Sequence, residues 1–295
     1  MHIPVLLNES ITGLSLVSGG TYVDCTTNRA GHSLEIAKRI GKNGTLVCID
    51  LDQTALKEAE ELLKALPEAP TLHFVSRNFR HIREILNELK IDTVDGVIAD
   101  LGLSSQELDE SKRGFTFRYD EPLLMTFQSN IDESTLTARD IVNTWKEESL
   151  ADIFFGYADE TYSRRIAKAI VKSRIISPIE TTFQLVEIIR TAVPVAYTHR
   201  HTHYATKTFQ AIRMAVNDEI CSIEDLLHSL VNVLRPQGRA AIITFHSTED
   251  RIVKKTYREE NELKVINKKA IVGTEEEIKN NPRARSAQLR ILERK

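Results

Sequence analysis

Residues 21–100 alternate between short apolar runs and longer segments whose apolar residues fall on one side only. Continuous apolar runs are typical of strands buried on both faces, whereas apolar residues spaced three and four apart are typical of helices. The pattern therefore predicts strands alternating with helices, joined as right-handed βαβ units in a doubly wound α/β sheet. The expected strands are 21–26, 45–50, 72–75 and 94–100, and the expected helices are 32–40, 55–66 and 82–89.

The alternation stops near residue 105 and resumes about 100 residues later. Residues 106–205 contain almost no β-rich runs, and a block of this length has the size of a domain. We therefore expect a discontinuous α/β domain of residues 1–105 and 206–295, interrupted by a helical insertion of residues 106–205. The insertion is expected to be helical at 138–145, 149–155, 163–173 and 182–191. After it we expect a long helical stretch with one break at 208–234, a turn at 235–238, a strand at 239–246, a helix at 251–260 and a final strand at 288–293.

Composition limits the class of protein. With 41% hydrophobic and 27% charged residues in 295, the chain is of the globular kind, which excludes disordered and fibrous classes. It has no apolar run of the roughly 18 residues that a membrane span needs, no visible signal peptide, and three cysteines without a Cys-x-x-Cys pair. We expect a cytoplasmic protein with no membrane association, disulfide framework or metal site. The net charge of −3 argues against a small basic nucleic-acid-coating protein, although an enzyme with a local basic surface is compatible with it.

Candidate chemistry lies where the predicted strands end, because open α/β sheets bind ligands beyond the carboxyl ends of their strands. Ala30 and Gly31 follow the first strand, and small residues there permit close approach of a ligand to the backbone before a helix N-terminus. Asp50 ends the second strand, and its carboxylate has two oxygens that can accept hydrogen bonds from the hydroxyls of a ribose.

The third and fourth strands add two further groups. Asn78 and Phe79 follow the third, where an amide and a ring are suited to an adenine, and Asp100 ends the fourth. A single acid at a strand end is equally compatible with a turn or a helix cap. Three suitable groups in nucleoside-binding order favour an adenosine-containing cofactor. The loop lacks the G-x-G-x-x-G fingerprint, which disfavours a nicotinamide dehydrogenase and fits a cofactor without a pyrophosphate, such as S-adenosylmethionine.

Several longer motifs point to a known family. The sequence resembles the bacterial 16S ribosomal RNA cytosine-N4 methyltransferases, the RsmH or MraW family, over almost its whole length. The motifs that carry the resemblance are His2-Ile3-Pro4-Val5-Leu6-Leu7-Asn8-Glu9, Gly31-His32-Ser33, Asp50-Leu51-Asp52, Asp95-Gly96, Asp100-Leu101-Gly102-Leu103-Ser104-Ser105, Arg113-Gly114-Phe115-Thr116-Phe117, Ala205-Thr206-Lys207-Thr208-Phe209-Gln210-Ala211-Ile212-Arg213, Val216-Asn217, Phe245-His246-Ser247-Thr248-Glu249-Asp250-Arg251-Ile252-Val253-Lys254 and Asn281-Pro282-Arg283-Ala284-Arg285-Ser286.

The resemblance implies a class I, Rossmann-like S-adenosylmethionine-dependent methyltransferase fold whose helical insertion recognises the substrate. It also implies methylation of the exocyclic amine, N4, of a cytidine in the P-site region of 16S ribosomal RNA in the small ribosomal subunit. By position in the motifs, the cofactor contacts fall on Ala30, Gly31, His32, Asp50, Phe79, Asp100 and Glu107. Asp100 is also the candidate catalytic residue, as acceptor of a hydrogen bond from the cytosine amine.

The chain departs from the family pattern in two segments. The family's loop Gly-Arg-Gly-Gly-His is here Asn28-Arg29-Ala30-Gly31-His32, and Glu107 stands where the family has a glutamine. In the segment that the family writes Asp-Gly-Pro-Leu-Asp-Met-Arg-Met-Asp, two carboxylates and one arginine are replaced by Leu124, Thr126 and Gln128. These departures leave a second hypothesis open, a divergent family member that binds RNA or the ribosome but methylates weakly or not at all.

Some residues have two open interpretations. Phe115 and Phe117 either stack on a base or pack the insertion against the core, and His246 either touches substrate or caps the next turn. The run His199-x-His201-x-His203 is expected to be a polar loop rather than a metal site. Two basic groups either contact phosphate or form solvated surface: Arg251, Lys254, Lys255, Arg283 and Arg285 in the C-terminal segment, and Arg164, Arg165, Lys168 and Lys172 on one helix of the insertion.

Overall fold

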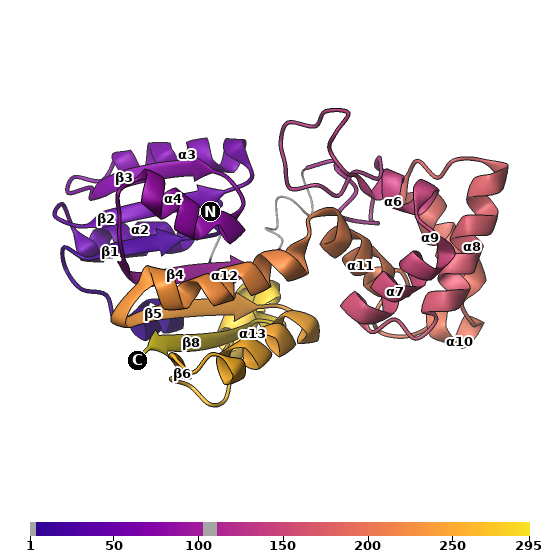
Figure 1. The fold of residues 1–295 in the computed structure, drawn as a ribbon. Helices are drawn as coiled ribbons and strands as arrows, with labels where there is room; N and C mark the ends of the chain where they lie inside the picture. Colours follow the sequence, from indigo (N-terminus) through magenta and orange to yellow (C-terminus); the bar gives the residue numbers. More distant parts are fainter. Residues whose placement is uncertain (1–3, 103–110) are drawn as a thin grey trace. The chain divides into compact units, whose positions relative to one another are not determined.

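The computed structural model describes residues 4–102 and 111–295 of the chain. It divides into two compact units, Met1–Gly102 with Ile220–Lys295 and Leu103–Glu219 (Figure 1). The chain returns to the first unit at residue 220, whereas the sequence predicted a return at 206. The reason is helix α11 (Thr206–Val216), whose buried Phe209 and Ile212 belong to the apolar core of the second unit. The predicted break in the stretch 208–234 falls between α11 and α12 (Glu219–Val233), close to the boundary of the units.

The first unit is built on one eight-stranded sheet. Its strand order is β3-β2-β1-β4-β5-β8-β6, with β7 paired to β8. Strands β3, β2, β1, β4 and β5 run parallel, and β8 runs antiparallel to β5. The order reverses at β1 and β4, which makes their carboxyl ends the switch point where sheets of this kind bind ligands. The strands are β1 (Thr21–Asp24), β2 (Thr45–Asp50), β3 (Thr71–Ser76), β4 (Val94–Leu101), β5 (Leu234–Thr244), β6 (Leu263–Val265), β7 (Ile271–Val272) and β8 (Gln288–Arg294).

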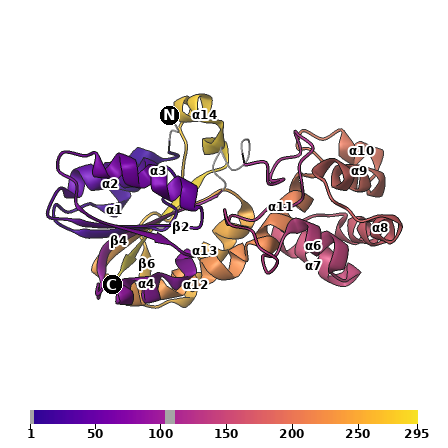
Figure 2. The same ribbon diagram turned by 90° about the horizontal axis from the view of Figure 1, so that it is seen from above.

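Helices cover both faces of this sheet (Figure 2). Successive strand residues point to opposite faces, so Tyr22 packs in one apolar cluster and Val23 in the other. Ile243 and Ile242 of β5 divide in the same way. One cluster contains residues of α1 (Leu7–Leu14), α2 (Gly31–Ile40) and α3 (Gln53–Lys64), and the other contains residues of α4 (Ile82–Glu88), α12 and α13 (Ser247–Glu259). The short elements η1 (Phe79–His81), α14 (Glu275–Asn280) and η2 (Pro282–Arg285) complete the unit.

The second unit is helical around its own apolar core. Leu150, Phe154, Ile166, Ile170 and Leu185 are completely buried in it. Because its helices enclose this separate cluster, the unit has the core that an independent domain needs. The helices are α6 (Ala138–Thr144), α7 (Glu147–Ala158), α8 (Ser163–Ile176), α9 (Thr182–Ala192), α10 (Val195–Thr198) and α11.

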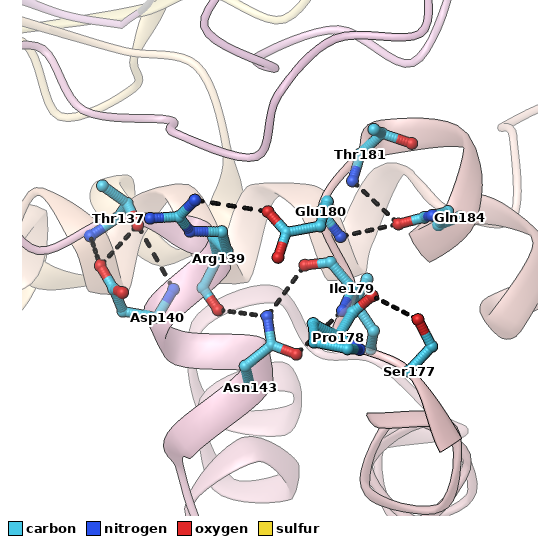
Figure 3. A network of polar contacts seen from close by, with 10 residues as sticks. All are labelled: Thr137, Arg139, Asp140, Asn143, Ser177, Pro178, Ile179, Glu180, Thr181 and Gln184. Atoms are coloured by element: carbon cyan, nitrogen blue, oxygen red, sulfur yellow. Dashed lines mark hydrogen bonds and ion pairs between the residues drawn. The ribbon is translucent and has the colours of Figure 1, made fainter. Parts of the chain in front are cut away.

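A polar network ties the end of α6 to the segment that precedes α9 (Figure 3). The Asn143 amide nitrogen donates to the Ile179 carbonyl oxygen, and its amide oxygen accepts from the Ile179 amide, both at 2.9 Å. Thr137 and Asp140 form a capping box at the start of α6, and Thr181 with Gln184 forms one at the start of α9. Reciprocal caps of this kind fix where each helix begins.

Several local features differ from the sequence prediction. The turn expected at 235–238 lies inside β5 as a bulge, because Leu234 pairs with Val94 and Arg239 already pairs with Gly96. Helices α1 and α14 and strands β6 and β7 were not expected.

Among residues 4–102 and 111–295, no helix combines the length and the apolar character needed to cross a membrane.

Candidate active site

Hydrogen bonds join the residues that follow β1 to the carboxyl end of β4. The Asp100 amide donates to the Thr26 hydroxyl at 2.7 Å, and the Cys25 amide donates to the Ile98 carbonyl at 2.9 Å. The two central strand ends of the switch point are thereby held together, and the charge of Asp100 contributes to the raised pKa of Asp24.

Asp50 organises the loop that follows β1. Its two carboxylate oxygens accept hydrogen bonds from the Asn28 amide at 2.7 Å and the Asp52 amide at 2.9 Å. Asp52 in turn caps α3 by accepting from the amides of Thr54 and Ala55. The strand-end acid is therefore a turn-forming residue as well as a candidate ligand group, and these bonds fix the orientation of its carboxylate.

The loop adopts backbone conformations that favour glycine. Asn28 and Ala30 have φ values of 46° and 60°, in the left-handed region. The resembled family has glycine at both positions, so this chain keeps the loop conformation with residues that adopt it less readily. At Gly31 a Cβ atom would lie only 3.0 Å from Cγ of Pro4. The small residue at position 31 thus accommodates a neighbouring part of the chain, whereas the sequence had suggested room for a ligand.

Asp24 and His32 are buried polar residues that affect each other electrostatically, and the sequence identified only one of them as a candidate. Asp24 is 2% exposed and accepts from the Ser33 hydroxyl at 2.6 Å and from the Thr26 amide at 3.1 Å. His32 is also buried, with its Nε2 atom 3.1 Å from the Val5 carbonyl oxygen. Burial raises the pKa of Asp24 and lowers the pKa of His32. His32 was a candidate, whereas Asp24 was not, although an acid at the end of a buried strand was the available signal.

Asp100 has the chemistry expected of a site residue. Its Oδ1 atom is buried and has no hydrogen-bond partner among the described residues. Burial raises the pKa of its carboxyl group to about 6; the cation of Arg283 opposes this shift, and the anion of Glu249 adds to it. An unsatisfied buried carboxylate oxygen with a raised pKa is unusual in a folded protein and typical of functional sites.

The remaining candidates are Phe79, with its neighbour Asn78, and Glu107. Phe79 begins η1 and is partly buried against the core that contains α4 and α12. The neighbouring Asn78 side chain is engaged by the protein, since its oxygen accepts from the Arg80 amide and its nitrogen donates to the Ser222 hydroxyl at 3.0 Å. Glu107 lies outside the described residues.

The structure shows His246 in the capping role that was one of its two interpretations. His246 is the N-cap of α13, its ring accepts from the Glu249 amide, and the Glu249 carboxylate accepts from the amides of Phe245 and His246. The capping interpretation is thus confirmed. Glu249 and Arg283 act electrostatically on Asp100, and the Arg283 guanidinium lies 5.2 Å from the centre of the Phe245 ring. Sequence reasoning had identified Arg283 only as a candidate phosphate contact.

Phe115 and Phe117 pack inside the helical unit. Phe115 stacks on Phe127 at 5.6 Å, and Phe117 stacks on His203 at 4.4 Å and meets Phe209 edge-on at 5.2 Å. The packing alternative holds, with the difference that the rings pack within the insertion's own core. In the part of the chain that the structure describes, no cluster of three or more His, Cys, Asp or Glu side chains is arranged to hold a metal ion.

Comparison with known proteins agrees with this architecture. Residues 1–295 match the model of the MraW methylase family. The chain belongs to this family. It is 43% identical over 311 residues to the ribosomal RNA small subunit methyltransferase H of Brevibacillus brevis and 42% identical over 313 residues to that of Finegoldia magna. Both alignments cover 99% of this chain and 98% of the relative.

Solved structures are similar at lower identity. An rRNA methylase from Streptococcus thermophilus has a TM-score of 0.46 and 7% identity, over 100% of this chain and 98% of that one. TrmN from Thermus thermophilus has a TM-score of 0.47 and 12% identity, over 98% of this chain and 48% of that one. The family match and the sheet order confirm two predictions: membership of the MraW methylases and a Rossmann-like, S-adenosylmethionine-dependent methyltransferase fold.

Proposed function

We propose that this chain methylates small-subunit ribosomal RNA with S-adenosylmethionine, at N4 of a cytidine in the P-site region of 16S ribosomal RNA. Family membership and the names of the two relatives support the class of substrate. The structural observation that carries the proposal is Asp100, whose buried carboxylate oxygen has no partner among the described residues and stands at the switch point of the sheet.

The residues around the switch point fit the proposed cofactor. The Asp50 carboxylate, oriented by the amides of Asn28 and Asp52, would accept hydrogen bonds from the ribose hydroxyls. Phe79 would hold the adenine, and the loop from Ala30 to His32 would hold the methionine part. Glu107, outside the described residues, is a further proposed contact. When bound, this cofactor supplies an electrophilic methyl group on a sulfonium cation.

Asp100 is the proposed catalytic residue. The cytosine amine is a weak nucleophile because its lone pair is delocalised into the ring, so orientation is what the protein must provide. In this proposal the ionised Asp100 carboxylate would accept a hydrogen bond from the amine and so orient its nitrogen for methylation. Arg283 favours that ionised form by its charge. The target base must leave its stack to reach such a site, and we assign the recognition of the RNA to the helical unit.

One observation favours the second hypothesis, a family member that binds RNA without efficient methylation. Where the family has carboxylates and an arginine, this chain has Leu124, Thr126 and Gln128. Here Arg113 donates to the backbone carbonyls of Thr126, Phe127 and Gln128, at 3.0, 3.0 and 3.2 Å. The segment is therefore held in place through its backbone, without the side-chain charges that the family pattern provides.

Two measurements separate the hypotheses. Small ribosomal subunits from cells lacking this protein are incubated with it and isotope-labelled S-adenosylmethionine, and the RNA is digested to nucleosides for mass spectrometry. We expect labelled N4-methylcytidine with the wild-type protein and none with Asp100→Asn. Label in another nucleoside would overturn the cytidine assignment. Absence of any label, together with no heat on calorimetric titration with S-adenosylmethionine, would favour the RNA-binding hypothesis.

A further inference from the structure

Among the helices that the structure describes in the helical unit, α8 carries the most basic residues. Its sequence, SRRIAKAIVKSRII, contains Arg164, Arg165, Lys168, Lys172 and Arg174 and no acidic residue. Its apolar side chains Ile166, Ala167 and Ile170 are buried in the core of the unit. The helix is therefore anchored by one face. Its cations lie on the others, and of these Arg174 donates to the Val142 carbonyl oxygen at 3.0 Å.

Three of these cations form a row. Arg164, Lys168 and Lys172 are exposed and four residues apart, which sets them about 6 Å apart along the helix axis. No described residue forms an ion pair or hydrogen bond with any of their side chains. Like charges at this spacing repel one another. We call these three residues the α8 row.

Some cations on other exposed helices of this chain are neutralised by an acid on the same helix. Lys38 pairs with Glu35 at 2.7 Å, Lys64 pairs with Glu60, and Arg190 pairs with Glu187 at 2.6 Å. Each partner lies three or four residues away on the same helix, the spacing that brings helical side chains together. The α8 row lacks such partners among the described residues, so its positive charges are available to bind an anion from solution.

A hollow adjoins the N-terminal end of this row. It has a volume of about 370 Å³ between α7 and the start of α8, and Phe155, Tyr162, Arg164 and Arg165 contribute to its lining. Phe155 is 65% exposed, which is unusual for so large an apolar side chain. The Arg165 guanidinium lies 5.6 Å from the centre of the Tyr162 ring. Asp152 is the single acid in the lining.

We propose that this surface is an RNA-binding site, in which the α8 row contacts consecutive phosphates and Phe155 stacks on an unpaired base. The proposal rests on the proposed function, since it names how the ribosomal RNA substrate is held. Charge complementarity carries it, because unpaired cations beside an exposed aromatic ring are what single-stranded nucleic acid binds. An anionic membrane fits less well, because the apolar side chains in the middle of α8 are buried and only Ile175 and Ile176 are exposed at its far end.

The first test removes the row. The triple variant Arg164→Gln, Lys168→Gln, Lys172→Gln is compared with the control Lys38→Gln, Lys64→Gln, Arg77→Gln, which loses the same charge from ion-paired positions. Binding to 16S ribosomal RNA is measured as a function of salt concentration. We expect the α8 variant to bind on the order of 10- to 100-fold more weakly at about 0.1 M salt, with a log–log salt slope shallower by about 2. The control should keep the wild-type slope.

The second test concerns the hollow. Phe155→Leu keeps an apolar side chain but loses the aromatic face, whereas Phe155→Tyr keeps that face. We expect about tenfold weaker RNA binding for leucine and near-wild-type binding for tyrosine, in line with the usual contribution of base stacking. Equal affinities for both variants would refute the stacking contact. Because Phe155 is largely exposed, circular dichroism and thermal unfolding should show both variants folded.

The outcomes distinguish this site from the proposed function. If the wild-type protein methylates the RNA while the α8 variant matches the control in slope and in KM, the α8 site is wrong and the function stands. If the wild-type protein binds neither 16S ribosomal RNA nor small ribosomal subunits, both are wrong. If the α8 variant loses binding to vesicles of phosphatidylcholine and phosphatidylglycerol but keeps its RNA affinity, the surface is a membrane site and the proposal is overturned.

Discussion

At the scale of single residues, the Asp100 carboxylate lowers the stability of the folded protein. Asp100 has a buried oxygen without a described partner, and burial raises the pKa of its carboxyl group to about 6. In the unfolded chain the same group titrates near 3.8. A pKa raised on folding means that the native state disfavours the ionised form, so the free energy of unfolding falls as pH rises from about 4 to 6 and stays lowered above that range.

Replacing Asp100 by asparagine should therefore stabilise the protein and remove its activity. A shift of about 2 pKa units corresponds to roughly 2–3 kcal/mol at pH 8 and to about half that at pH 5. We expect Asp100→Asn to raise the free energy of unfolding in urea by this amount at pH 8 and by less at pH 5. Asp92 is exposed, so Asp92→Asn serves as the control and should show no such pH-dependent gain. A destabilised Asp100→Asn at pH 8 would contradict the prediction.

The same group predicts how methyl transfer depends on pH. If ionised Asp100 orients the amine, kcat/KM falls below a pH of about 6, approaching tenfold per pH unit. The Arg283 cation lowers the pKa of Asp100, so Arg283→Gln should move this acidic limb to higher pH. The profile is measured from pH 5 to pH 9 on small subunits. An unchanged or lowered midpoint in Arg283→Gln would show that another group controls the acidic limb.

Gly31 provides a packing test in the same loop. A Cβ at this position would lie 3.0 Å from Cγ of Pro4, so Gly31→Ala should cost about 1–2 kcal/mol in the free energy of unfolding. Pro4→Gly removes both this Cγ atom and the Pro4 Cβ atom, which would lie 3.1 Å away, and in that background Gly31→Ala should cost clearly less. The four proteins form a double-mutant cycle in urea unfolding. Additive effects would mean that Pro4 is not the constraint on residue 31.

At the scale of elements, Asn143 joins α6 to the chain before α9. Its side chain exchanges two hydrogen bonds with the Ile179 backbone and donates a third to the Arg139 carbonyl at 2.8 Å (Figure 3). Asn143→Ala leaves the Ile179 amide and carbonyl without these partners and should destabilise the helical unit by about 1–3 kcal/mol. Asn143→Asp keeps the side-chain acceptor, so its Tm in thermal unfolding should fall between those of the wild-type protein and Asn143→Ala. A change below about 0.5 kcal/mol for alanine would mean that water replaces these bonds without loss.

Elements with a local signal could be predicted, and those held by distant contacts could not. The strand 45–50 was expected and observed, because an unbroken apolar run is itself the mark of a buried parallel strand. Helix α1 was missed because its first turn depends on the Glu277 carboxylate, which accepts from the Leu6 amide across 271 positions. The candidate site shows the same difference. Asp50 and Asp100 could be predicted because they end predicted strands. The effect of Arg283 and Glu249 on Asp100 could not, because only the fold brings these distant residues close to it.

At the scale of the whole molecule, the boundary of the helical unit depends on contacts that sequence patterns do not show. The Asn217 side chain, after α11, donates to the Met125 carbonyl and accepts from the Phe127 amide, both at 2.8 Å. Arg213 pairs with Glu219 at 2.7 Å, with both side chains largely buried. These bonds fix the end of α11 to the helical unit, and the chain enters the α/β unit only afterwards.

Two units with separate cores and one proposed cofactor site predict two separable unfolding transitions. The single tryptophan, Trp145, packs against the core of the helical unit, so its fluorescence reports on that unit, whereas circular dichroism reports on both. S-adenosylmethionine at about 100 times its Kd should stabilise the α/β unit by about 2.7 kcal/mol. We expect the ligand to raise the Tm of a transition seen by circular dichroism and to leave the Trp145 transition unchanged. Gly31→Ala should lower only the first, and Asn143→Ala only the second. A ligand-induced rise in the Trp145 transition would instead mean that the two cores unfold as one cooperative unit.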